Sequence, residues 1–316
     1  MTAGAGGARE PGIRVLVTGW PSFADGVATA GDVLAMEAVA AALAGAEIGC
    51  DLAWSPVLRP GGLDLADAAP GRYTHLVFAC GPLHGPQVAG LHERYRACTR
   101  IAVGVSVVDP ADPAAARFDL ILARDAPGTE AQRDLSAQVP VTPVPVAGVV
   151  LADEQPEYRA AQTGPPVTAW LSRWLTGLNC ARIPLDTRLD TRDWAHHATP
   201  GQFESVIRRL DVVVTTRLHG LVLALKNGVP ALAVDPVPGG AKVTAQACAW
   251  GWPVLTASRD DTPDPGSLDR LWSWCLSAEG ASRARAAAAG NWAPPLTRGL
   301  LAALTGDQPP GPHQGP

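Results

Sequence analysis

Three side chains that can bind or react with an anion follow two apolar segments of the chain. Arg217 and His219 come directly after the apolar run 211–214, and Lys242 follows the next run, 230–234, through a glycine-containing turn. An arginine guanidinium can bind a carboxylate or a phosphate through two parallel hydrogen bonds. A neutral histidine can take a proton from a hydroxyl. These residue types predict a site for an anionic small molecule with an acid or base beside it.

The sequence around these residues predicts a strand, a helix, a second strand and a second helix. Parallel strands of this kind end at one edge of the sheet, where ligands usually bind. The free N–H groups at the start of a helix also favour an anion. We therefore expect Thr216, Leu218 and Gly220 to line the same site as Arg217. Lys242 opens the next helix and can reach the same ligand.

Each of these residues also has a structural explanation. Arg217 can form an ion pair with an aspartate, His219 can cap a helix, and Lys242 can be an ordinary surface lysine. The sequence leaves these alternatives open.

Gly31 and Asp32 are candidates for a substrate-binding cleft in the N-terminal half. They follow the first predicted strand after a loop of about ten residues and begin a helix. The glycine permits close approach of a ligand to the backbone. Asp32 can equally cap its own helix. The spacing matches neither a dinucleotide-binding nor a P-loop motif.

Arg124 and His84 are further candidates for this cleft. Arg124 follows the predicted strand 120–123, where a salt-bridged turn is the simplest explanation. His84 and His92 flank the loop after the strand at 75–80, and either loop histidine can reach a cleft or face solvent.

Apolar segments alternate with helical patterns along the chain, and they are nearly continuous, which indicates sheets covered on both faces. The expected strands are 14–18, 75–80, 101–108, 120–123, 146–151, 180–184, 211–214, 231–234 and 254–256. The expected helices include 31–43, 129–138, 165–178, 200–210, 242–250, 267–276 and 281–289.

The length of 316 residues suits two domains, and three prolines in 138–145 indicate a linker between them. We predict an α/β protein with two Rossmann-like domains facing a cleft. The N-terminal domain covers 13–139 and the C-terminal domain 144–304, with flexible tails at 1–12 and 306–316.

Composition excludes several classes of protein. The net charge of −5 gives no basic footprint for nucleic acid. The six cysteines are dispersed without a C-x-x-C pair, and no HExxH motif is present, so we expect no metal and no cofactor. Neither a signal peptide nor an apolar stretch of about 20 residues that could span a membrane is visible. We expect a cytoplasmic protein.

The segment 211–242 resembles the signature of the polysaccharide pyruvyl transferase family. The resemblance rests on Arg217-Leu218-His219 after an apolar strand, then Gly228-Val229-Pro230 before the next strand, then Lys242. More loosely, Gly31-Asp32 and Arg124-Asp125 resemble two other family pairs, and Gly104-Val105-Ser106 resembles a family glycine strand.

This resemblance implies a fold like that of the two-domain GT-B glycosyltransferases. It also implies the transfer of a pyruvyl group from phosphoenolpyruvate to two hydroxyls of a sugar, as a ketal. The N-terminal domain would then hold the acceptor and the C-terminal domain the donor. Arg217 would bind the donor and His219 would act as acid or base.

The chain departs from the family pattern in its N-terminal half. The segment 20–30 lacks the usual Gly–Asn before Gly31-Asp32, and Gly81-Pro82-Leu83-His84 replaces a double glycine. We expect these departures to change the acceptor.

Two other functions fit the sequence. The first is a GT-B-type glycosyltransferase that uses a nucleotide sugar, for which Asp235 is the one candidate to bind a ribose. The second is a non-catalytic relative of the family that binds a partner.

Overall fold

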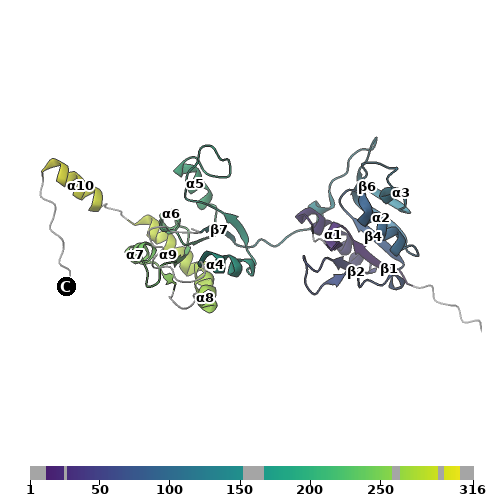
Figure 1. The fold of residues 1–316 in the computed structure, drawn as a ribbon, viewed down its shortest axis with the longest axis horizontal. Coiled ribbons are helices and arrows are strands. Elements are labelled where there is room, and N and C mark those ends of the chain that lie inside the picture. The colour runs from purple at the N-terminus through teal and green to yellow at the C-terminus, as the bar shows by residue number, and fades with distance from the viewer. Residues whose placement is uncertain (1–11, 25–26, 152–166, 258–263, 291–294, 307–316) are drawn as a thin grey trace, which may run out of the picture. The chain divides into compact units, whose positions relative to one another are not determined.

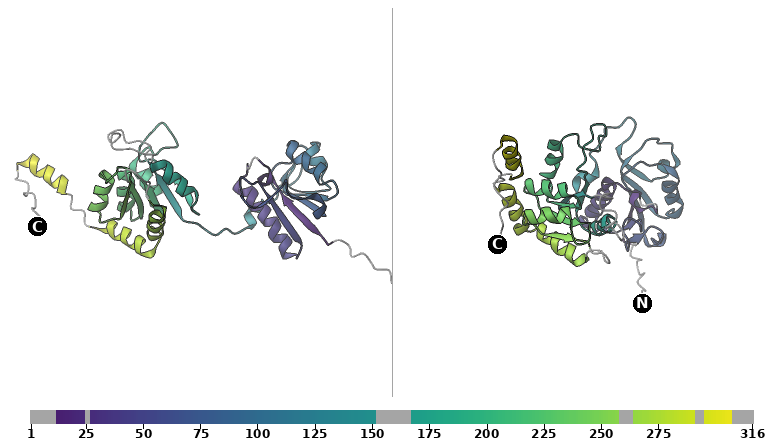
Figure 2. Two further views of the ribbon diagram at one scale, coloured as in Figure 1. Left: turned by 60° about the horizontal axis from the view of Figure 1, so that its bottom comes forward. Right: turned by 60° about the vertical axis from the view of Figure 1, so that its left-hand side comes forward.

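The computed structural model describes residues 12–24, 27–151, 167–257, 264–290 and 295–306. The chain divides into two compact units, Met1–Thr142 and Pro143–Pro316. The division falls within the proline-rich segment 138–145. Each unit contains one parallel sheet with helices on both faces (Figures 1 and 2). The expected tails lie outside the described residues, except for Gly12 and Gly306.

The first unit is a six-stranded sheet in the order β3-β2-β1-β4-β5-β6. Its strands are β1 (Arg14–Thr18), β2 (Gly49–Trp54), β3 (Leu63–Asp64), β4 (His75–Ala79), β5 (Thr99–Ser106) and β6 (Leu120–Asp125). Its α-helices are α1 (Ala30–Gly45), α2 (Gly85–Arg94) and α3 (Pro113–Ala116), and its 3₁₀ helices are η1 (Trp20–Ser22), η2 (Pro70–Arg72) and η3 (Leu135–Gln138). This order is that of a dinucleotide-binding Rossmann sheet, and it reverses between β1 and β4.

The second unit is a five-stranded sheet in the order β11-β10-β9-β7-β8. Its strands are β7 (Val146–Val150), β8 (Ala181–Pro184), β9 (Val212–Thr215), β10 (Ala231–Asp235) and β11 (Val254–Thr256). Its helices are α4 (Val167–Thr176), α5 (Pro200–Ile207), α6 (Leu218–Lys226), α7 (Lys242–Ala249), α8 (Pro265–Cys275), α9 (Ala278–Ala289) and α10 (Pro295–Thr305). Counted from β7, the order is the flavodoxin-like 2-1-3-4-5, which reverses between β7 and β9. Ligands of such sheets bind outside the carboxyl ends of the strands at this reversal.

Apolar side chains cover both faces of the second sheet. Every residue of β9 and β10 is buried. Successive residues of a strand point to opposite faces. Val213 therefore packs with residues of α5, α6 and α7, whereas Val212 and Val214 pack with residues of α4 and α8. This burial on both sides explains the unbroken apolar runs in the sequence.

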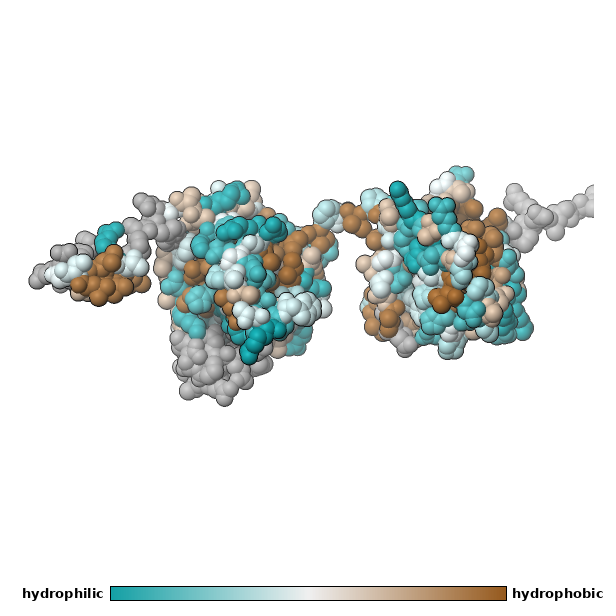
Figure 3. Space-filling model, turned by 90° about the horizontal axis from the view of Figure 1, so that it is seen from above, coloured by the Kyte–Doolittle hydropathy of each residue, from teal (hydrophilic) through white to brown (hydrophobic). Residues whose placement is uncertain are grey.

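Two pairs of tryptophans pack in or against the core of this unit. Trp174 and Trp272 lie edge to face with ring centroids 5.8 Å apart, and Trp252 and Trp274 are 5.1 Å apart. A different apolar group is exposed on α10, where Figure 3 shows a hydrophobic patch. The exposed side chains there are Leu296, Leu300, Leu301 and Leu304.

Several elements differ from the sequence-based expectation. The expected helix at 129–138 is wrong, since only the 3₁₀ helix η3 forms there. The elements β2, β3, α2, α3 and α10 were not expected. Among the described residues, no helix combines the length and apolar character needed to cross a membrane.

Candidate functional site

Arg217 lies at the reversal of strand order in the second sheet. It is the N-cap residue of α6 and follows β9, which is the neighbour of β7. The buried hydroxyl of Thr215 accepts a hydrogen bond from the Arg217 backbone N–H at 2.9 Å and donates to the Val150 carbonyl at 3.0 Å. This hydroxyl therefore fixes the backbone of Arg217 against the ends of β7 and β9.

Gly220 brings the first turn of α6 onto the ends of these strands. A Cβ atom at this position would lie 2.2 Å from Thr215 Oγ1 and 3.2 Å from Val150 Cγ1. Gly220 is buried, as is Thr216, whose N–H donates to the Val150 carbonyl at 3.2 Å. Both residues, expected to line the donor site, are thus buried beneath the start of α6, while Leu218 is half-buried.

The Arg217 guanidinium keeps unused hydrogen-bonding capacity. Its side chain is 36% exposed, and its Nη2 lies 3.7 Å from Asp186 Oδ1, beyond the length of a hydrogen bond. Its Nε is buried and has no partner within the described chain. Asp186 follows β8 on the far side of β7, and the sequence did not point to it. Among the described residues, the guanidinium therefore makes one long ion pair, and its exposed N–H groups can form new hydrogen bonds.

His219 lies in the first turn of α6, two residues after Arg217. Its side chain is exposed, and within the described residues it forms no polar contact. An imidazole in this position is accessible to a ligand beside Arg217.

Lys242 begins α7, which follows β10, the other neighbour of β9. The turn before it is organised by the buried Asp235. The Asp235 carboxylate accepts hydrogen bonds from the N–H groups of Val237 (3.1 Å), Ala241 (2.7 Å) and Thr244 (2.9 Å), and from the Thr244 hydroxyl (2.9 Å). Asp235 thus holds the turn that presents Lys242 at the same edge as Arg217.

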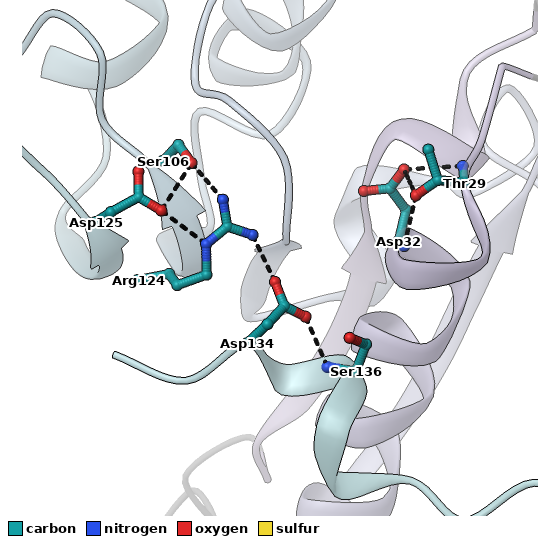
Figure 4. A network of polar contacts seen from close by, with 7 residues as sticks. All are labelled: Thr29, Asp32, Ser106, Arg124, Asp125, Asp134 and Ser136. Carbon is teal, nitrogen blue, oxygen red and sulfur yellow. Dashed lines mark hydrogen bonds and ion pairs between the residues drawn. The ribbon is translucent and has the colours of Figure 1, made fainter. Parts of the chain in front are cut away.

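In the first unit, Gly31 and Asp32 belong to a helix cap. The Asp32 carboxylate accepts hydrogen bonds from the Thr29 N–H at 3.0 Å and the Thr29 hydroxyl at 2.8 Å (Figure 4). The Thr29 hydroxyl in turn accepts from the Asp32 N–H. A Cβ on Gly31 would make only an ordinary contact of 3.6 Å. The capping alternative accounts for Asp32, whereas the cap does not require a glycine at position 31.

The Arg124 guanidinium is satisfied by its own unit. It donates to Asp125 at 2.7 Å, to Asp134 at 2.5 Å and to the Ser106 hydroxyl at 2.6 Å (Figure 4). Hydrogen bonds from Arg124 and Ser106 lower the pKa of Asp125. Burial opposes ionisation of Asp134, but hydrogen bonds from Ser136 and Arg124 outweigh it and lower its pKa. Arg124 therefore closes a salt-bridged turn, which uses three of its five N–H donors.

His84 is the exposed N-cap residue of α2, and its ring lies 5.7 Å from that of Trp20. The expectation that His92 lies in a loop is wrong. His92 is buried in α2, where Nε2 contacts the Ala114 carbonyl at 2.9 Å, and burial lowers the pKa of its imidazole. Of these two histidines, only His84 is accessible to a ligand.

No metal site emerges from the described part of the chain, where no three His, Cys, Asp or Glu side chains cluster suitably. All six cysteines are free.

Comparison with known proteins found a family whose model matches part of the chain. Residues 111–236 match the family described as "Polysaccharide pyruvyl transferase". It is this segment, and not the whole chain, that matches a polysaccharide pyruvyl transferase domain. The family is one of transferases, so the expected family and the expected class of enzyme are both confirmed. No curated protein matches the chain.

The matched segment contains most of the candidate site. It runs from just before α3 to the end of β10 and includes Arg217, His219 and Asp235. Gly31-Asp32, His84 and Lys242 lie outside it.

Solved structures that resemble the chain include sugar transferases. "Spinosyn Rhamnosyltransferase SpnG complexed with thymidine diphosphate" is 14% identical, with 88% of this chain and 95% of that chain covered and a TM-score of 0.33. The E. coli heptosyltransferase WaaC with ADP is 11% identical, with coverages of 83% and 100% and a TM-score of 0.26. A putative UDP-N-acetylglucosamine 2-epimerase from Listeria monocytogenes is 11% identical, with coverages of 95% and 99% and a TM-score of 0.30. The expected α/β fold with two Rossmann-like units is confirmed by the two parallel sheets.

Proposed function

We propose that the protein transfers a pyruvyl group from phosphoenolpyruvate to two hydroxyls of a sugar, forming a ketal. The observation that carries this proposal is the Arg217 guanidinium at the reversal between β7 and β9. Among the described residues, its Nε has no partner and its one ion pair is 3.7 Å long, and the exposed His219 lies two residues further on.

Phosphoenolpyruvate suits this position because it carries a carboxylate and a phosphate. Arg217 can bind either group through charge-assisted hydrogen bonds. The free N–H groups in the first turn of α6 favour the same negative charge. Lys242 is placed by the Asp235 turn at the end of the neighbouring strand, where an ammonium can complete the donor site. We assign the donor to the second unit and the acceptor mainly to the first.

The reaction needs two proton transfers around the donor. One proton is added to the methylene carbon of phosphoenolpyruvate, and a sugar hydroxyl loses its proton as its oxygen attacks C2. The bond from C2 to the phosphate oxygen then breaks, and inorganic phosphate leaves with one proton. A second hydroxyl attacks the same carbon and loses its proton, which closes the ketal. His219 moves one of these protons, as an exposed imidazole beside the donor can do.

The buried Asp235 argues against a nucleotide-sugar donor. Asp235 was the one candidate to bind a ribose, but its carboxylate is 1% exposed and accepts four hydrogen bonds from its own turn. Binding a ribose hydroxyl would require breaking this cap. The open guanidinium of Arg217 and the accessible imidazole of His219 also favour an active enzyme over a non-catalytic relative.

Thermal shift experiments test the choice of donor. We expect phosphoenolpyruvate to raise the unfolding temperature, and UDP-, GDP- and TDP-sugars to leave it unchanged. An unfolding temperature that responds to a nucleotide sugar and ignores phosphoenolpyruvate would overturn the proposal. A response to neither would favour the non-catalytic relative.

A further inference from the structure

The loop between β8 and α5, residues 185–199, carries a tryptophan whose side chain is exposed to solvent. The side chain of Trp194 is 97% exposed, in contrast to the paired tryptophans of the core. An indole contributes a large apolar surface when it is covered. At this exposure Trp194 contributes almost none of that surface to the fold.

The loop is ordered by its own hydrogen bonds. Asp193 accepts from the Ala195 N–H at 3.0 Å and pairs with the His196 ring at 2.9 Å, and the other ring nitrogen of His196 contacts Arg188 at 2.9 Å. The Asp190 N–H donates to the His197 carbonyl at 3.0 Å. These bonds on both sides of Trp194 fix the backbone that projects the indole.

A hollow of about 1030 Å³ lies beside Trp194, between the loop and the helix α5. Apart from the indole, its lining is mostly polar. It includes Asp190, Asp193, His197, Thr199, Gln202 and Ser205. Carboxylates, hydroxyls and an amide can exchange hydrogen bonds with several hydroxyls of a ligand. One aromatic face among many such groups suits a pyranose ring, which has an apolar C–H face and a polar rim. A protein partner would instead need an apolar centre of contact.

The loop that lines the hollow begins at the same edge of the sheet as Arg217. Its loop leaves the carboxyl end of β8 through Asp186, the residue that pairs with Arg217 at 3.7 Å. The helix α5 follows this loop in the chain. A sugar in the hollow would therefore lie on the donor side of the reaction.

We propose that this hollow binds a pyranose residue of the acceptor, with Trp194 stacked on the ring. The role of this pyranose as the acceptor rests on the proposed pyruvyl transfer, whereas its binding in the hollow does not. This subsite adds to the contacts that the first unit is proposed to make with the acceptor.

Saturation-transfer difference NMR tests the proposal on the full chain. The probes are methyl β-D-galactopyranoside and methyl β-D-glucopyranoside at millimolar concentration. We expect transfer to at least one of them in the wild type, a loss of at least tenfold in Trp194→Ala and a largely retained signal in Trp194→Phe. The control is Leu296→Ala, which removes another exposed apolar side chain of this unit and should leave the signal unchanged.

Two outcomes would overturn this inference: equal transfer in wild type and Trp194→Ala, or no transfer to either pyranoside in the wild type. Because Trp194 is exposed, we expect the unfolding temperature of Trp194→Ala to match the wild type, so a loss of signal cannot come from unfolding. Pyranoside binding that depends on Trp194 in a protein that ignores phosphoenolpyruvate would retain this inference and reject the pyruvyl transfer. A monomer–dimer equilibrium that depends on Trp194, without sugar binding, would show a protein interface instead.

Discussion

Replacing Arg217 by alanine should remove donor binding and leave the fold intact. The guanidinium forms one ion pair of 3.7 Å and is 36% exposed. An ion pair of this kind contributes about 0–1 kcal/mol to stability. In contrast, charge-assisted hydrogen bonds to phosphoenolpyruvate are worth about 1.5–3 kcal/mol. At about 1.4 kcal/mol for each factor of ten, Arg217→Ala should raise the Kd for phosphoenolpyruvate roughly 10- to 150-fold.

Isothermal titration calorimetry with phosphoenolpyruvate measures this change, and thermal unfolding of the same samples verifies the fold. Arg208→Ala is the matched control, because Arg208 is an exposed arginine of the same unit that pairs with Glu204 at 3.3 Å. We expect Arg208→Ala to bind the donor like the wild type. Arg217→Lys keeps the charge without the planar pair of donors and should bind with intermediate affinity. Equal donor affinity in wild type and Arg217→Ala would refute the reasoning.

Three further predictions concern His219, Gly220 and Asp134. His219→Ala should retain donor binding while turnover falls by about 10² to 10⁴, as for a lost general acid or base, and unchanged turnover would remove His219 from the mechanism. Gly220→Ala should lower the unfolding temperature, because its Cβ would lie 2.2 Å from a buried hydroxyl. Gly31→Ala, whose Cβ would make only a 3.6 Å contact, should leave the unfolding temperature unchanged. Equal unfolding temperatures of the two variants would contradict the packing argument. The lowered pKa of Asp134 means that its contribution to stability is present above its unfolded pKa of about 4 and is lost as the pH falls through the folded pKa. The unfolding temperature of Asp134→Asn should therefore depend less on pH between 5 and 3 than that of the wild type, and parallel curves would contradict this assignment.

The sequence predicted the strands best where burial on both faces leaves an unbroken apolar run. β9 and β10 are such strands, since all of their residues are buried. The strand β2 could not be predicted from the sequence because the charged Asp51 interrupts its apolar residues. The structure compensates this charge with Arg14 at 2.6 Å and the Tyr73 hydroxyl at 3.0 Å, contacts between residues far apart in the chain.

The helix α2 was missed for a different reason. Its sequence contains Gly85, Pro86 and Gly90, which favour a loop when they are considered alone. Tertiary packing overrides this preference, because Val88, Leu91 and His92 are buried on one face of the helix. The burial of His92 follows from the same packing.

The position of Arg217 and His219 could be predicted because both follow an apolar strand within five residues. Asp186 and Trp194 could not be linked to them in this way. Asp186 meets Arg217 because the strand order is β9-β7-β8, and the sequence alone does not give this order. Trp194 lies in a segment without periodicity, and its exposure depends on the hydrogen bonds that order the loop.

A crystal structure of the protein with phosphoenolpyruvate tests the donor site most directly. We predict carboxylate or phosphate oxygens of the donor within about 3 Å of the Arg217 guanidinium, at the start of α6, with the His219 imidazole facing C2 or the methylene carbon. Density for phosphoenolpyruvate elsewhere, with Arg217 still paired to Asp186 alone, would contradict the assignment of this edge of the sheet as the donor site.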